Sequence, residues 1–181
     1  MKKDLSLWQF ASFVFIVFLG TLLHFLYDFS GQNTVAALVS GVNESTWEHM
    51  KLLYFPHLAF SFIQHKFFKE YGNFRCIKLR GILFGLILIP VIFYTYNGVF
   101  GKSPDFVNIA IFFVSAALMC FSEWKLFKKD KTDCNCNSNC KYPSICLLIM
   151  ILIGVLFIVF TFYVPKIPLF KDPVTGAYGI E

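Results

Sequence analysis

Long runs of apolar residues dominate this chain and limit what it can fold into. Five stretches rich in Phe, Ile, Leu and Val cover residues 7–27, 48–66, 81–97, 106–122 and 143–164. A bilayer core about 30 Å thick needs a helix of about 20 residues, and the stretches lack the alternation typical of strands. With 57% hydrophobic and only 15% charged residues, the composition argues against a soluble monomer and against intrinsic disorder. We therefore predict an all-α membrane bundle of five transmembrane helices, forming a single domain over residues 1–181.

The second stretch is the shortest, because its purely apolar part covers only residues 52–63. Ser45 and Glu48 match the S-x-x-E pattern of a helix N-terminus, and Asn43 is another candidate cap. A helix over about residues 44–68 is long enough to cross the bilayer. Its first two turns then carry several charged and polar residues.

The distribution of basic residues favours five crossings over four. With five, 12 of the 16 Lys and Arg residues face the cytoplasm: Lys2, Lys3, Lys66, Lys69, Arg75, Lys78, Arg80, Lys125, Lys128, Lys129, Lys131 and Lys141. With four, only Lys2, Lys3, Lys102, Lys166 and Lys171 do. The positive-inside rule then places the N-terminus inside and the C-terminus outside, with residues 165–181 as an extracytoplasmic tail. The net charge of +5 therefore reports topology, and we expect no nucleic-acid partner.

Ionisable residues gather at the outer ends of the expected helices, where they suggest a site. His24 and Asp28 are spaced i, i+4 and share a helix face, and so do Glu44 and Glu48. Together they offer three carboxylates and an imidazole, enough for a divalent metal or an acid–base pair. We take these four as candidate metal ligands and His24, Asp28, Glu48 and His49 as candidate catalytic residues. The structural alternative is that they only cap helices and pair with neighbours.

Polar and aromatic residues at the same end are candidates for binding a substrate. The tail, with three prolines and two glycines between residues 165 and 179, is expected to fold over the site as a lid or to remain a loosely held end. The candidate substrate-binding residues are Asn43, Trp47, Tyr94, Asn97, Asp172 and Tyr178.

Three cysteines form a separate cluster in the expected inner loop. Cys134, Cys136 and Cys140 lie in the segment D-C-N-C-N-S-N-C. Stable disulfides are rare in the cytoplasm, so these thiols are candidate ligands for zinc or Cu(I). The alternative is a polar loop without a metal.

Three segments resemble a known family. They read H-F-L-Y-D-F-S-G, V-N-E-S-T-W-E-H-M-K-L-L-Y-F-P and L-F-K-D-P-V-T-G-A-Y-G-I, and the N-E-S-x-W-E-H element is the most specific. The chain resembles small bacterial integral membrane proteins of unknown function over nearly its whole length. The resemblance implies a multi-pass protein of the bacterial inner membrane, with no activity, substrate or cofactor attached to it.

Two classes of function are left open by the sequence. The first is a metal-dependent or acid–base hydrolase that acts on a lipid-like substrate at the outer leaflet, with membrane lipid as its partner. The second is a small carrier or an accessory or structural membrane subunit without catalysis. The sequence contains no G-x-S-x-G, H-E-x-x-H or phosphate-binding glycine loop, so no known motif selects the reaction or the cofactor.

Overall fold

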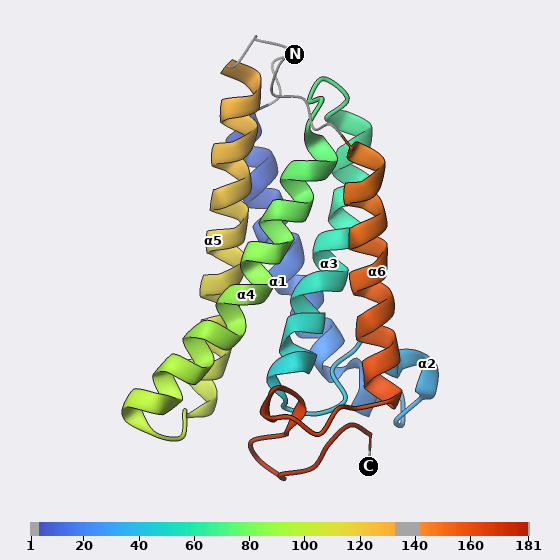
Figure 1. Cartoon of the computed structure of the whole chain (residues 1–181), viewed down its shortest axis with the longest axis vertical. Helices are drawn as coiled ribbons and strands as arrows, with labels where there is room; N and C mark the ends of the chain where they lie inside the picture. Colours follow the sequence, from blue (N-terminus) through green and yellow to red (C-terminus); the bar gives the residue numbers. More distant parts are fainter. Residues whose placement is uncertain (1–3, 133–141, 181) are drawn as a thin grey trace.

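Five long helices lie side by side in a computed structural model that describes residues 4–132 and 142–180 (Figure 1). Within these residues the fold is all-α, as predicted. A short α2 and the tail lie at one end of the bundle (Figure 1). The elements are α1 (Leu5–Phe29), α2 (Thr34–Ala37), α3 (Thr46–Phe67), α4 (Phe74–Phe100), α5 (Asp105–Thr132), α6 (Pro143–Phe162) and the 3-10 helix η2 (Pro168–Phe170).

Four helical segments are long and apolar enough to cross a membrane: Leu5–Phe29, Phe74–Phe100, Phe106–Asp130 and Pro143–Phe162. The fifth long helix, α3, falls outside this set because it carries several ionisable residues. It packs mainly against α1 and α4 and also touches α5 and α6. The five-span count and the orientation of the termini therefore stay predictions.

The beginning of α3 shows how local sequence sets the geometry of this end. Ser45 is the N-cap, and its hydroxyl accepts a hydrogen bond from the Glu48 amide at 3.4 Å, as the capping pattern predicted. Asn43 Oδ1 accepts from the Ser45 amide at 2.9 Å. The Glu48 carboxylate reaches further back and accepts from the Val42 amide at 3.2 Å. Helix α3 thus begins at Thr46, and the two residues before Thr46 lie outside it.

Close packing inside the bundle contrasts with an apolar outer surface. Small residues let the helices approach: a Cβ added at Gly85 of α4 would lie 2.9 Å from Met119 Sδ on α5. Such glycine contacts are typical of membrane helix interfaces. Large apolar side chains, including Phe10, Phe18 and Leu152, point outward from the bundle. This arrangement suits a bundle whose outer faces lie against lipid.

The tail folds back onto the beginning of α3. Phe170 stacks near Trp47, with ring centroids 4.7 Å apart. Lys171 and Tyr178 form an isolated antiparallel bridge, and the side-chain amide of Asn43 donates to the Gly179 carbonyl at 3.0 Å. The tail is therefore held against the end of the bundle at which α3 begins.

Candidate metal centre

Three side chains from different parts of the chain converge at the end of the bundle near the tail. His24 comes from α1, Glu44 from the segment before α3, and His49 from the first turns of α3. One ligand atom from each lies within 4.8 Å of the other two, and this is the single such His/Cys/Asp/Glu group among the described residues. Glu44 lies between the imidazoles: its Oε1 is 3.5 Å from His24 Nε2, and its Oε2 is 3.6 Å from His49 Nε2.

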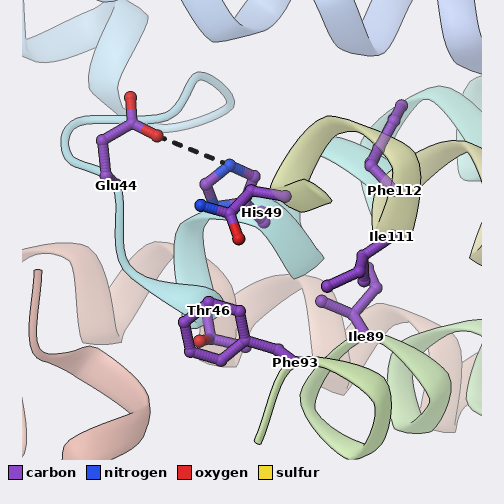
Figure 2. A pocket seen from close by; sticks show the side chains of 8 residues that line it. Glu44, Thr46, His49, Ile89, Phe93, Ile111 and Phe112 are labelled. Carbon is purple, nitrogen blue, oxygen red and sulfur yellow. Dashed lines mark ion pairs between the residues drawn. The ribbon is translucent and has the colours of Figure 1, made fainter. Parts of the chain in front are cut away.

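The His49 ring is oriented by the backbone of its own helix. Its Nδ1 lies 3.0 Å from the Ser45 carbonyl oxygen. A carbonyl oxygen only accepts, so Nδ1 carries the hydrogen and Nε2 keeps its lone pair. Nε2 faces Glu44 across the ion pair drawn in Figure 2. Histidines that bind a metal through one ring nitrogen commonly donate a hydrogen bond from the other ring nitrogen to a carbonyl in this way.

Glu44 is positioned by the tail. Asp172 is buried, and its Oδ2 accepts a hydrogen bond from the Glu44 amide at 3.3 Å. Its other oxygen, Oδ1, accepts from the Val174 and Thr175 amides at 2.6 and 3.2 Å. One carboxylate therefore joins the turn of the tail to the residue that bridges the two imidazoles.

Two pockets of opposite character meet at this cluster. An apolar pocket of about 250 Å³ lies between α1, α3 and α5 and is lined by both histidines, with Phe25, Ile109 and Phe113 among its other walls. A more polar pocket of about 170 Å³ is lined by a separate set that includes Tyr27, Asp28, Asn43, Glu44 and Asp172. The cluster thus borders both apolar side chains and polar groups of the loop and tail.

Two imidazoles and one carboxylate are a common ligand set of catalytic zinc, in which water takes the fourth position. A metal held by His24, Glu44 and His49 would act as a Lewis acid and generate a nucleophile from water near neutral pH. Glu44 is the most exposed of the three, with 44% of its side-chain surface accessible. Without a metal, the same groups form a carboxylate–imidazole pair suited to proton transfer.

Glu48, a predicted ligand and catalytic residue, lies away from the cluster. Its Oε2 is 2.5 Å from the Lys51 ammonium, and both side chains are buried. Lys51 also donates to the Ala37 carbonyl and to Thr161 Oγ1, each at 3.0 Å. The i, i+4 argument fails here because α3 begins at Thr46, so Glu44 and Glu48 do not share a helix face. Glu48 instead belongs to a buried ion pair that joins α2, α3 and α6.

The other predicted residues divide between the polar pocket and more distant positions. Asp28 lines the polar pocket with Glu44 but is not among the three clustered ligands. Trp47 packs on the aromatic side chains of α6 and the tail. Asn97 accepts from the Ser103 amide in the α4–α5 turn, and Tyr94 is largely exposed further back on α4. The remaining cysteine candidates, Cys134, Cys136 and Cys140, lie outside the described residues.

One group was missed by the sequence analysis. Lys78, counted there as a loop charge, is buried inside the bundle with Glu123 and His57. The partner of His57 is the Glu123 carboxylate, whose Oε1 lies 2.6 Å from Nε2 of the ring. The sequence did contain a signal for this group, because each of the three ionisable residues lies within or beside an apolar stretch, where such residues are usually paired.

The fold and the site together define the class: an all-helical protein with several helices apolar enough to lie in a membrane and a His/Glu cluster at one end. The chain belongs to a family of unknown function (DUF6512), whose model matches residues 1–180. This confirms the family resemblance noted in the sequence. No curated protein and no solved structure matches the chain.

Proposed function

We propose that this protein is a metal-dependent hydrolase of the bacterial inner membrane that acts on a lipid-like substrate at the extracytoplasmic leaflet. The observation that carries the proposal is the convergence of His24, Glu44 and His49 where an apolar and a polar pocket meet. In this proposal His24, Glu44 and His49 bind the metal, and Asp28 contributes to the polar pocket that receives the headgroup.

The proposed topology has five crossings, with α3 as the central one. Helix α3 has 22 residues and runs beside the other long helices (Figure 1). At 1.5 Å per residue this is about 33 Å, enough for a bilayer core. Its charges do not oppose insertion, since Glu48 pairs with Lys51 and His57 with Glu123 inside the bundle. The basic residues then favour an N-terminus in the cytoplasm and a site outside.

The apolar pocket supports a lipid-like substrate. Its walls include Phe25, Ile109 and Phe113, all of which are also exposed on the outer surface of the bundle. A chain entering from the bilayer would lie against these side chains and end at the imidazoles. The polar pocket would receive the headgroup on the other side of Glu44. The reaction class is hydrolysis: a water oxygen attacks an ester or phosphoester centre, and the leaving oxygen takes up a proton.

Elemental analysis of the protein purified in mild detergent tests the metal site. We expect about one zinc or similar divalent ion per chain in the wild type, and its loss in a His24→Ala/Glu44→Ala variant. Asp28→Asn and Cys134→Ser/Cys136→Ser serve as controls that keep the metal. Loss of metal only in the cysteine variant would move the centre to the loop. A folded wild type that neither retains nor takes up metal would contradict the metal site. The alternatives would then be metal-free acid–base chemistry or a purely structural cluster.

Lipid turnover tests the substrate. Wild type is reconstituted with a bacterial lipid extract, and the lipid species are followed by mass spectrometry with and without chelator. Ile109→Trp should fill the apolar pocket, so we expect it to keep the metal and lose turnover. Val114→Trp is the matched control, because Val114 is also exposed on α5 but is not a wall of the pocket. Equal turnover in both variants would contradict the role of the pocket.

A further inference from the structure

A second ionisable cluster lies inside the bundle, separate from the His24–Glu44–His49 centre. His57 of α3, Lys78 of α4 and Glu123 of α5 meet there, and none exposes more than 1% of its surface. Glu123 Oε1 lies 2.6 Å from His57 Nε2, and Glu123 Oε2 lies 2.6 Å from Lys78 Nζ. Each carboxylate oxygen thus has one partner, and three helices are joined through one side chain.

The hydrogen-bond pattern leaves one atom without a partner. With Glu123 ionised beside the Lys78 ammonium, Nε2 of His57 donates to the carboxylate, so Nδ1 has a bare lone pair. Among the described residues, Nδ1 is buried and has no hydrogen-bond partner. An unpartnered buried acceptor carries a desolvation cost. In an ion-pair network that is purely structural, this atom would be expected to have a donor.

The fold makes room for the carboxylate and surrounds it with few other charges. A Cβ added at Gly81 would lie 2.4 Å from Glu123 Cγ, so the carboxylate packs directly on the α4 backbone. Cys120, one turn before Glu123, is the other titratable side chain beside it on α5, and its thiol faces Ser12 of α1 at 3.9 Å. The buried residues of α6 (Met150, Gly154, Phe157 and Thr161) and those of α1 near the cluster (Gln9, Ser12 and Ile16) are uncharged.

Other buried polar groups along the interior have no hydrogen-bond partner among residues 4–132 and 142–180. Gln64 is two turns from His57 on the same face of α3, and both atoms of its buried side-chain amide lack a partner. The buried amide of Gln9 on α1 is unpartnered as well, and so is the hydroxyl of Ser115 on α5. Buried polar groups of this kind are ordinarily satisfied by internal water. Water at these positions would supply protons to the open nitrogen of His57.

We infer that the His57–Glu123–Lys78 triad is a reversible proton-binding site within the membrane bundle. A proton from bulk solvent, relayed through internal water, binds Nδ1 of His57 while the Nε2 hydrogen passes to Glu123 Oε1. One proton enters and nothing is oxidised or reduced. The triad goes from a neutral set, Lys⁺/Glu⁻/His, to Lys⁺/GluH/His, in which the imidazole has changed tautomer and Lys78 has lost its counter-charge.

Nitrogen-15 NMR of histidine-labelled protein in lipid nanodiscs tests this inference, because ring nitrogens with and without hydrogen give separate signals. The chain has four histidines. His57 is assigned as the signal common to the His24→Gln, His49→Gln and His65→Gln variants, which leaves the site itself intact. As the pH is lowered stepwise from about 8 to the acid limit at which the protein stays folded, we expect the hydrogen of His57 to move from Nε2 to Nδ1. Infrared difference spectra should show a buried carboxylic acid band with the same midpoint.

Glu123→Gln should abolish both the tautomer change and the infrared band, whereas Glu70→Gln, at an exposed carboxylate between α3 and α4, should leave both unchanged. If Glu123→Gln does not fold, the wild-type spectra still decide the question. A His57 ring that keeps its Nε2 hydrogen over the whole range in which the protein stays folded would overturn the proton site. A doubly protonated ring without a new carboxylic acid band would overturn the transfer to Glu123.

Discussion

The Nδ1 atom of His49 lies 3.0 Å from the carbonyl oxygen of Ser45, one turn earlier in the chain. This hydrogen bond fixes the tautomer of the ring, so that Nε2 faces Glu44 with a lone pair. The ring therefore depends on the N-cap of α3, since Ser45 provides both the capping hydroxyl and this carbonyl. The capping segment and the proposed metal centre form one local structure.

Glu44→Gln should lower the affinity for Zn²⁺ by more than about 100-fold. Mutating a residue that only hydrogen-bonds to a metal ligand already lowers metal affinity by about 10- to 100-fold, and Glu44 is itself a proposed ligand. The change removes the charge that bridges the two imidazoles while keeping the shape of the side chain. Isothermal titration of the chelator-treated protein in detergent measures the effect. Asp28→Asn is the matched control from the adjoining polar pocket, and we expect its affinity to stay close to that of the wild type. Equal affinities in the two variants would remove Glu44 from the ligand set.

The Glu48–Lys51 pair should contribute to stability and not to metal binding. Both side chains are buried, and Lys51 has two further partners on α2 and α6. Removing one member leaves an uncompensated buried charge, which costs about 3–5 kcal/mol. We expect Glu48→Gln and Lys51→Met each to lose a substantial part of the free energy of unfolding.

A double-mutant cycle separates the pair interaction from other effects. The Glu48→Gln/Lys51→Met protein should lose clearly less than the sum of the two single variants, since neither charge is then unpaired. Thermal unfolding in detergent gives the stabilities, and zinc content is measured on the same samples. Additive losses, or loss of zinc from a folded Glu48→Gln protein, would contradict this assignment.

Much of the fold was predictable, because apolar length and capping patterns act locally. The long helices cover the predicted stretches, except that α6 ends at Phe162, two residues before the predicted end, and Ser45 caps α3 as its S-x-x-E pattern indicated. The clustering of His24, Glu44 and His49 was predicted only in part, because the proposed ligands were His24, Asp28, Glu44 and Glu48, with His49 as a catalytic residue. The i, i+4 spacing predicted Glu44 and Glu48 on one helix face, whereas a helix start at Thr46 directs the Glu44 carboxylate to the imidazoles and the Glu48 carboxylate to Lys51.

The interior triad could not be derived from spacing. His57, Lys78 and Glu123 are far apart in the chain, and each has a plausible local role as a core histidine or as a charge near a helix end. Their meeting depends on the register of three packed helices, which includes the contact of Gly81 with Glu123. Apolar periodicity identifies such helices but leaves their rotation and vertical offset undetermined.

Asp172 should couple the tail to the proposed metal centre. Its carboxylate accepts hydrogen bonds from the amides of Glu44, Val174 and Thr175, so Asp172→Ala leaves three donors without this partner. We expect faster amide hydrogen exchange across residues 171–179 and a several-fold weaker affinity for Zn²⁺. Val174→Ala is the control, because the Val174 side chain is exposed and the change keeps the amide that Asp172 binds. Unchanged exchange in the tail of Asp172→Ala would show that Phe170 and Asn43 hold the tail by themselves.

Gly81→Ala should strain the interior triad specifically. The added Cβ would lie 2.4 Å from both Cγ and Oε1 of Glu123, so the carboxylate must move away from His57 or Lys78. Overpacking of this kind costs about 1–3 kcal/mol. Gly98→Ala is a matched control on the same helix, because its Cβ would meet nothing within 4 Å. Alanine there should be neutral or stabilise α4 by up to about 1 kcal/mol through helix propensity.

Unfolding in detergent measures both glycine variants, and the histidine NMR spectrum reports whether the His57–Glu123 hydrogen bond survives. We expect a perturbed His57 signal in Gly81→Ala and an unchanged one in Gly98→Ala. If both alanine variants matched the wild type in stability and in the His57 signal, Glu123 would have enough freedom to sit elsewhere. The register of α4 against α5 would then not be what holds its carboxylate between the imidazole and the ammonium.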